Sequence, residues 1–289
     1  MGARALLLLL ACGVALTAKP ARPKSVTAAC TNSSGDCTLE LQAALDTGAE
    51  TVRIPHIGRP WILSMAGNPG GAALRARAGG YHGAAISLRS HQQLVLESGV
   101  VLQAARGSFH GEQDSLVMGA SVENVSIIGE PPLGATLQMW LLDYANKSLY
   151  TEGTCSGRGA CRMGVSLMNV SGLEMRRLTV RRSGGDGVFV RGVYGGLFKD
   201  LVLDDNFRQG ISLTDGRDLL FEDVAMINTG QGAAAGPSCG LDIEPDNPAN
   251  RLQNITFRRC LAREQHGVRL HDLAARPRHP TYRVTRHTL

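Results

Sequence analysis

The chain has 289 residues, of which 43% are hydrophobic and 19% are charged, and this balance excludes a disordered chain and a coiled coil. The formal net charge of +5 is too small to indicate nucleic-acid binding, so no nucleic-acid partner is expected. A solvated basic surface is the preferred interpretation of this charge, and an acidic ligand is the alternative.

The first 18 residues have the pattern of a secretory signal. Arg4 precedes an apolar run at residues 5–16, and the small residues Ala15 and Ala18 predict cleavage at or near Ala18. We therefore expect a secreted, extracellular protein. No later segment reaches about 18 consecutive apolar residues, so we expect no membrane span.

Six cysteines follow the signal, and an even number in a secreted chain favours disulfides over a metal site. Close spacing predicts the pairs Cys30–Cys37 and Cys155–Cys161, whereas the pairing of Cys239 and Cys260 stays open. The chain has no CxxC or HExxH motif, so no zinc site is expected. Five N-x-[ST] sequons are candidate glycosylation sites, three of which are alternatively explained as asparagines at strand starts; they begin at Asn32, Asn124, Asn146, Asn169 and Asn254.

A short helix is predicted at about residues 38–47. Thr38 is the expected N-cap and Gly48 the expected end. The apolar face of this helix consists of Leu39, Leu41, Ala44 and Leu45. We expect the helix to cover the first turn of the following fold, because an open sheet edge would invite aggregation.

Internal repeats determine the predicted architecture. Five segments share the pattern glycine, apolar, any residue, apolar, and a second series of short apolar segments runs in step with them; the five are GVSL (164–167), GVFV (187–190), GISL (210–213), GLDI (240–243) and GVRL (267–270). Each repeat holds at least two short strands with period two, too short for a propeller blade and without helical periodicity. The spacing predicts an all-β solenoid, a parallel β-helix of about seven coils, with inward Val, Ile and Leu.

One β-helix domain is therefore expected at residues 19–275. The basic segment 276–289 breaks the repeat and is expected to be an unstructured tail. Since no second capping helix follows the last coil, we expect a longer gene product, the tail or a second chain to cover that end.

The repeats resemble those of the pectin-lyase-like superfamily of right-handed parallel β-helices. The resemblance covers roughly residues 37–273 and includes the segments FHG (109–111), GATLQMWLLDY (134–144), SGGDGVFV (183–190), DDNFRQGISL (204–213) and GLDIEPDNP (240–248). It implies a β-helix fold and a polysaccharide-acting or polysaccharide-binding protein, because the superfamily includes lyases, hydrolases, epimerases and non-catalytic adhesins.

The polygalacturonases of that superfamily offer a residue-by-residue comparison. Asp186 is placed similarly to the acid of their NTD motif, but Arg208 and Gln209 stand where their DD pair would follow one coil later. His266 and Gly267 resemble part of their GHG motif, one coil late. The DPH-type motif of alginate epimerases is missing. These departures argue against polygalacturonase or epimerase chemistry.

The two-residue strand period predicts the candidate site. Side chains that flank the inward positions form two outward columns, with neighbouring coils about 4.8 Å apart. The first column is Ser166, Phe189, Ser212, Asp242 and Arg269, and the second is Met168, Arg191, Thr214, Glu244 and His271. Asp186, Arg208, Gln209 and His266 lie just before these strands. Phe189 is interpreted either as a sugar-stacking platform or as a stray exposed aromatic side chain.

These positions give the candidate roles. The catalytic candidates are Asp242, Glu244, Asp186 and His271, and the substrate-binding candidates are Arg191, Arg208, His266, Arg269 and Phe189. Asp242 beside Arg269 is expected to stay ionised, and Glu244 beside His271 is the expected proton donor. For each single residue, a stabilising polar pair on the sheet is the alternative explanation.

We expect a secreted β-helix that binds, and as the preferred hypothesis cleaves, a polysaccharide, and whether that polysaccharide contains uronate stays open. Hydrolysis by two carboxylates and elimination with arginines that neutralise the uronate both stay open. The alternative is a non-catalytic β-helix that binds carbohydrate at a cell surface or in a matrix. No cofactor is expected, and calcium on Asp242, Glu244 and Asp246 is the weaker alternative.

Overall fold

The computed structural model describes residues 22–33, 35–66, 83–151, 155, 161–230 and 239–263, with the backbone of two short strands at 268–270 and 283–284. The expected signal at residues 1–18, the candidate residues His266 and His271 and most of the segment 276–289 lie outside these ranges. The side chain of Arg269 also lies outside them.

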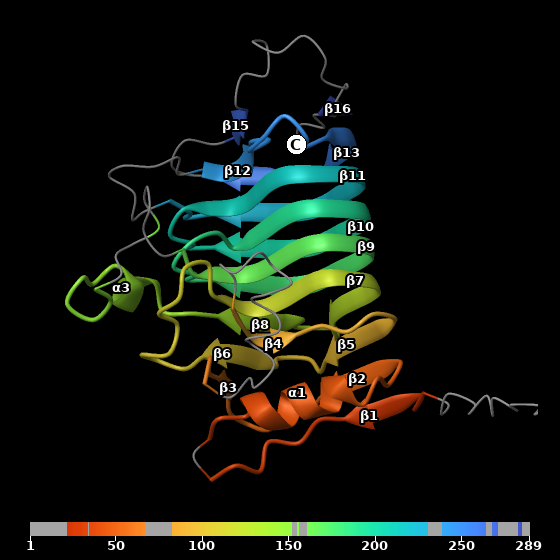
Figure 1. Ribbon diagram of the computed structural model, residues 1–289, viewed down its shortest axis with the longest axis vertical. Coiled ribbons are helices and arrows are strands. Elements are labelled where there is room, and N and C mark those ends of the chain that lie inside the picture. The colour runs from red at the N-terminus through yellow and green to blue at the C-terminus, as the bar shows by residue number, and fades with distance from the viewer. Residues whose placement is uncertain are drawn as a thin grey trace, which may run out of the picture.

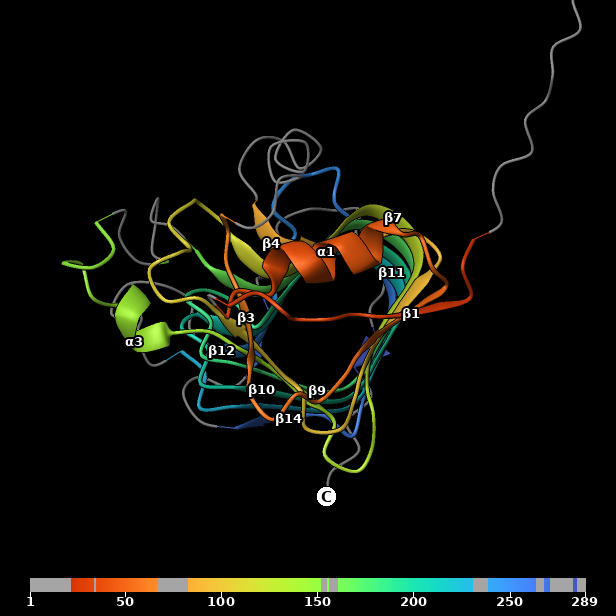
Figure 2. The ribbon, with the colours of Figure 1, turned by 90° about the horizontal axis from the view of Figure 1, so that it is seen from below.

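The protein is mostly β, with a long parallel sheet whose successive strands lie one above the other (Figure 1). The main path of this sheet runs through β1 (Ser25–Thr27), β2 (Thr51–Ile54), β5 (Gln92–Leu96), β7 (Ser115–Gly129), β9 (Met163–Arg181), β10 (Val188–Asp204), β11 (Gln209–Ile227), β12 (Cys239–Ile243) and β15 (Val268–Leu270). Seen end-on, the turns of the chain superpose around a common interior (Figure 2). We call each such turn a coil.

Shorter strands complete the coils. One series pairs β3 (Trp61–Leu63), β6 (Val101–Ala104), β8 (Ala135–Gln138) and β9 in that order. The other short strands are β4 (Ala84–Ser87), which pairs with β7, and β13 (Leu252–Arg258) and β14 (Leu261–Arg263), which both pair with β11. A short helix, α3 (Leu141–Tyr144), lies in the long connection between β8 and β9.

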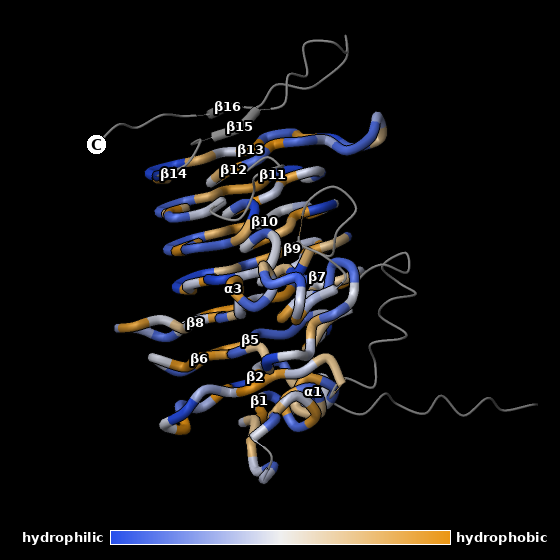
Figure 3. The backbone as a smooth tube through the Cα atoms, turned by 90° about the vertical axis from the view of Figure 1, so that its left-hand side faces the viewer, coloured by the Kyte–Doolittle hydropathy of each residue, from blue (hydrophilic) through white to orange (hydrophobic). Residues whose placement is uncertain are grey.

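The predicted repeats form the stacked strands, with the expected inward residues in the core. Val188 pairs with Val165 and Ile211, and Ile211 pairs with Leu241, and all four side chains are buried. Along each coil, hydrophobic residues interleave with hydrophilic ones (Figure 3), as the two-residue period requires when one face of a strand packs inward.

The repeated glycine has a steric cause. A Cβ atom added at Gly164, Gly187 or Gly210 would lie 2.6, 2.8 and 2.6 Å from the carbonyl oxygen of the glycine one coil later. Each coil therefore approaches the next so closely at this column that only glycine fits.

Columns of residues with positive φ form the corners of the coils. One column contains His91, Asn124, Gly172, Gly195, Asp218 and Asn254, each directly before an in-register residue of its strand. Asn and Asp tolerate this left-handed conformation better than other non-glycine residues. Three sequon asparagines, Asn124, Asn169 and Asn254, have positive φ, so they form corners inside long strands rather than strand starts, and all five sequon asparagines are exposed.

The predicted helix is α1 (Thr38–Asp46), and it lies across the lower end of the stack (Figures 1 and 2). The expected N-cap was wrong by one residue, since Cys37 is the N-cap and Thr38 the first helical residue. The Thr38 backbone N–H and hydroxyl donate to Asp36 Oδ1 at 2.9 and 2.6 Å, so Asp36 supplies the cap. Gly48, with φ of +70°, follows the helix as predicted.

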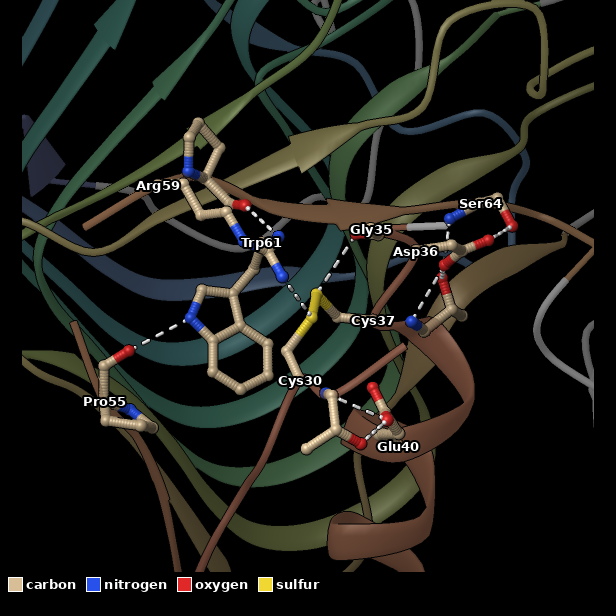
Figure 4. The surroundings of a disulfide bond; sticks show 12 residues. Cys30, Gly35, Asp36, Cys37, Glu40, Pro55, Arg59, Trp61 and Ser64 are labelled. Carbon is tan, nitrogen blue, oxygen red and sulfur yellow. Dashed lines mark hydrogen bonds between the residues drawn. A yellow bond between two sulfur atoms is a disulfide. The ribbon is translucent and has the colours of Figure 1, made fainter. Parts of the chain in front are cut away.

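Both predicted disulfides, Cys30–Cys37 and Cys155–Cys161, are present, whereas Cys239 and Cys260 are not disulfide-bonded. The first disulfide fastens the segment before α1 beside the buried Trp61, whose indole N–H donates to the Pro55 carbonyl at 3.0 Å (Figure 4). It thereby closes the lower end of the stack together with α1.

The expectation of an unstructured C-terminal tail needs one correction. Residues Arg283–Val284 form β16, which pairs in parallel with β13 through Thr256–Arg283 and Phe257–Val284. The free edge of β13 offers backbone donors and acceptors that a further strand can satisfy. Covering by the tail was one of the expected alternatives for this end.

Candidate functional site

The strand register places the first predicted column as expected. Ser166 lies opposite Phe189, Phe189 opposite Ser212, and Ser212 opposite Asp242. The backbone of Asp242 lies opposite that of Arg269 in β15. The two-residue period was sufficient for this part of the prediction, because all these strands are parallel and in register.

Two details of the columns were wrong. Phe189 is only 8% exposed and packs with Met163 and Met168, so it is neither a sugar-stacking platform nor a stray exposed side chain. A register shift between Val190 and Arg191 pairs Arg191 with Asp215 instead of Thr214. An irregularity of this kind changes the direction in which nearby side chains point. The two-residue period of the sequence does not predict where it occurs.

The structure joins four polar residues from three coils into one chain of contacts. Arg208 Nε lies 3.0 Å from Asp186 Oδ1, and Arg208 Nη2 donates to Gln209 Oε1 at 2.9 Å. Gln209 Nε2 in turn donates to Asp242 Oδ2. We call Asp186, Arg208, Gln209 and Asp242 the acid–arginine chain. The role of Gln209 as the link between the two acids was not predicted, since the sequence showed it only at the rim.

Charged side chains around the acid–arginine chain, including Glu244, Asp246 and Arg191, shift one another's pKa values. The carboxylates of Asp186, Asp242 and Glu244, with Asp186 the strongest, raise the pKa of Arg208. Complete burial raises the pKa of Asp186, while the Arg208 guanidinium acts in the opposite direction. Loss of surrounding water raises the pKa of Asp246, with Glu244 adding to this shift and Arg191 and Arg208 opposing it.

Burial divides these residues into two groups. Asp186, Gln209 and Asp242 are fully buried, whereas Arg208 and Glu244 are partly exposed and Arg191 is exposed. A ligand in solution therefore meets Glu244 and the two guanidiniums first. The buried carboxylates of Asp186 and Asp242 contact Arg208 and Gln209, respectively, and so hold these two side chains in position.

This arrangement can do two kinds of chemistry. A partly exposed carboxyl such as Glu244 can exchange a proton with a bound molecule, and Arg191 and Arg208 can bind an anionic group through charge-assisted hydrogen bonds. Within the described ranges, no group of three or more His, Cys, Asp or Glu residues is arranged to hold a metal ion.

Comparisons with known proteins identify a similar fold. The crystal structure of a "putative glycosyl hydrolase" from Parabacteroides merdae superposes with a TM-score of 0.54 at 13% sequence identity, over 82% of this chain and 97% of that chain. No protein-family profile matches the chain, and no curated protein matches it. No helix among the described residues is long and apolar enough to cross a membrane. At this low identity, the likeness to the solved structure concerns the fold alone.

Proposed function

We propose that the protein is a secreted right-handed parallel β-helix of the pectin-lyase-like type that binds and cleaves a polysaccharide containing uronate. The in-register parallel coils, the glycine column and the two disulfides support the fold and the secretion. The structural neighbour described as a glycosyl hydrolase is compatible with a carbohydrate substrate.

The observation on which this proposal depends is the convergence of the acid–arginine chain with Glu244. Three successive coils place Asp186, Asp242 and Glu244 around one guanidinium. A structural ion pair on a sheet needs one acid and one base, and the additional carboxylates must be kept close together against their mutual repulsion.

Glu244 is the proposed proton donor or acceptor, because it is the carboxyl of this set that is partly exposed. Arg191 and Arg208 bind the uronate carboxylate, with Arg269 as a further candidate on the next coil. Asp186 and Asp242 position Arg208 and Gln209 from beneath. His266 and His271 remain candidates for a base if the reaction is an elimination.

A second candidate function is non-catalytic carbohydrate binding. Asp186 and Asp242 are fully buried, and Arg208 and Gln209 contact them directly, which is also what a purely structural network would show. In that case the exposed arginines bind a glycan that is not cleaved.

The substitution Glu244→Gln tests the catalytic proposal. Purified protein is offered a panel of neutral and uronate-containing polysaccharides, and product is followed as unsaturated uronate absorbance and as new reducing ends. We expect the variant to lose about 10²–10⁴-fold in turnover with unchanged thermal stability, because general acid–base catalysis contributes that factor. Glu123→Gln, at an exposed acid on a different corner, is the matched control and should keep full activity.

Two outcomes contradict the proposal. Wild-type turnover in Glu244→Gln removes this residue from the reaction. Absence of both products from every polysaccharide, together with measurable binding of one of them, supports the non-catalytic alternative.

A further inference from the structure

A trough runs across the outside of the sheet formed by β2, β5, β7 and β9, which lie one above the other in Figure 1. It consists of two adjoining cavities of about 740 and 590 Å³. Thr51 and Gln93 line both cavities, so the two hollows adjoin at these residues. The acid–arginine chain lies elsewhere, with Asp186 before β10, Arg208 directly before β11, Gln209 at the start of β11, and Asp242 within β12.

The strand register builds the floor of this trough. Thr51, Gln93, Ser126 and Glu174 form one outward row in register, and Arg53, Val95, Ile128 and Arg176 form the next. The residues between the two rows, Val52, Leu94, Ile127 and Met175, are buried in the core. The trough thus crosses four parallel strands, a length of about 14 Å at the usual strand separation.

Two coil corners flank the floor. His91, Asn124 and Gly172 of the positive-φ column line one side, and Glu130, Pro131 and Arg177 line the other. The accessible lining is mainly polar, with hydroxyl and amide groups, because the aliphatic side chains Val95 and Ile128 are only 8% and 6% exposed. Sugar hydroxyl groups can donate hydrogen bonds to such groups and accept hydrogen bonds from them.

The charges in the trough are unequal. Arg53 pairs with Glu130 at 2.7 Å, and Arg176 pairs with Glu174 at 3.2 Å. Arg177 Nε instead donates to the Gly129 carbonyl at 2.7 Å. No carboxylate of the described residues pairs with Arg177. The trough is also lined by Arg22 and Glu50, so its four guanidiniums outnumber its three carboxylates and leave a positive charge for an anionic ligand.

We propose that this trough is a second, non-catalytic binding site for a linear acidic oligosaccharide. The guanidinium of Arg177 binds a carboxylate or sulfate group of the sugar, because a planar fork of N–H donors matches such groups. Thr51, Gln93 and Ser126 exchange hydrogen bonds with the sugar hydroxyls. The site is independent of the proposed cleavage at Glu244, and binding here needs no turnover.

The test is binding by calorimetry. The probes are an oligogalacturonate, a heparin-derived oligosaccharide, neutral maltohexaose and a single-stranded oligonucleotide of matched length. The protein is made in a host that attaches no N-glycans, because Asn124 begins a sequon and lines the trough. We expect binding of at least one acidic oligosaccharide, weaker at higher salt, and no binding of maltohexaose. The two acidic probes distinguish carboxylate from sulfate recognition.

Gln93→Glu is the decisive variant, since Gln93 is exposed on the floor of both cavities and the change adds a repelling charge. Gln253→Glu makes the same change at an exposed position of β13 and is the control. We expect Gln93→Glu to raise the Kd about tenfold or more and Gln253→Glu to leave it unchanged. Arg177→Asn, which suits the positive φ at this position, should weaken binding similarly.

Three results would overturn the proposal: no binding of either acidic oligosaccharide, equal binding of the oligonucleotide, or equal effects of Gln93→Glu and Gln253→Glu. Loss of cleavage with intact binding would instead refute only the proposed function.

Discussion

Glu222 shows how single residues tie the coils together at the surface. Lys199 Nζ, one coil earlier, lies 2.8 Å from its carboxylate, and Arg259 Nη2, one coil later, lies 2.6 Å from it. Arg258 also pairs with it, and Arg259 reaches Asp223 as well. These bonds, that of Lys199 first, lower the pKa of Glu222 to about 2 from its ordinary value of 4.5.

This shift predicts a pH dependence of the free energy of unfolding. Because the pKa of Glu222 is lower in the folded than in the unfolded chain, its contribution is complete above about pH 4.5 and is lost as the pH falls towards 2. Chemical denaturation between pH 6 and pH 2.5 should show a smaller loss of stability in Glu222→Gln than in the wild type. Parallel pH profiles for the two proteins would contradict this assignment.

At the same scale, the sequence predicted which residues meet but not how they are covered. The strand period placed Asp186, Arg208, Asp242 and Glu244 together, because parallel in-register strands turn sequence spacing into spatial proximity. It did not predict that Asp186 and Asp242 are fully buried, or that Phe189 is buried against Met163 and Met168. Whether an outward side chain is buried depends on segments outside the repeat. The two-residue strand period carries no information on where those segments lie.

Among the elements, α1 joins the first coil through its buried face. Leu41 and Leu45 are fully buried in the main core, whereas Leu39, which was assigned to the same face, is 59% exposed. The assignment of Leu39 was wrong because it precedes Leu41 by two residues, which is about 200° around a helix of 3.6 residues per turn, so it lies away from the buried face of Leu41, Ala44 and Leu45. The existence of the helix and the glycine that follows its C-cap were predicted correctly from periodicity and from Gly48, and the helix ends at Asp46.

A matched pair of leucine substitutions tests this capping role. Leu41→Ala should lower the free energy of unfolding by about 2–5 kcal/mol, because it leaves a cavity in the core. Leu39→Ala removes the same atoms from an exposed position and should change stability by no more than about 0.5 kcal/mol. Urea denaturation measures both. Equal costs would mean that α1 does not pack on the first coil as described.

For the whole molecule, stability depends on contacts between neighbouring coils. Phe198, Phe221 and Phe257 form an inner ladder, with ring centroids 4.4 and 4.7 Å apart and nearly parallel planes. The register of β10, β11 and β13 aligns these three residues. In a stack of this kind each coil contacts only its neighbours, so a local defect should spread over a limited distance.

Phe221→Ala tests how far such a defect spreads. The substitution removes the middle ring of the ladder, and we expect a cost of about 3–5 kcal/mol. Amide hydrogen exchange should then accelerate in β10, β11 and β13, on both sides of the cavity, while β2 and β5 at the other end keep most of their protection. Tyr194→Ala, on the same strand as Phe198 but at a half-exposed side chain, is the control and should leave the exchange pattern unchanged. A uniform loss of protection from β2 to β13 would show instead that the stack opens as one cooperative unit. Coupling between neighbouring coils alone would weaken the effect of the Phe221 cavity before it reached β2.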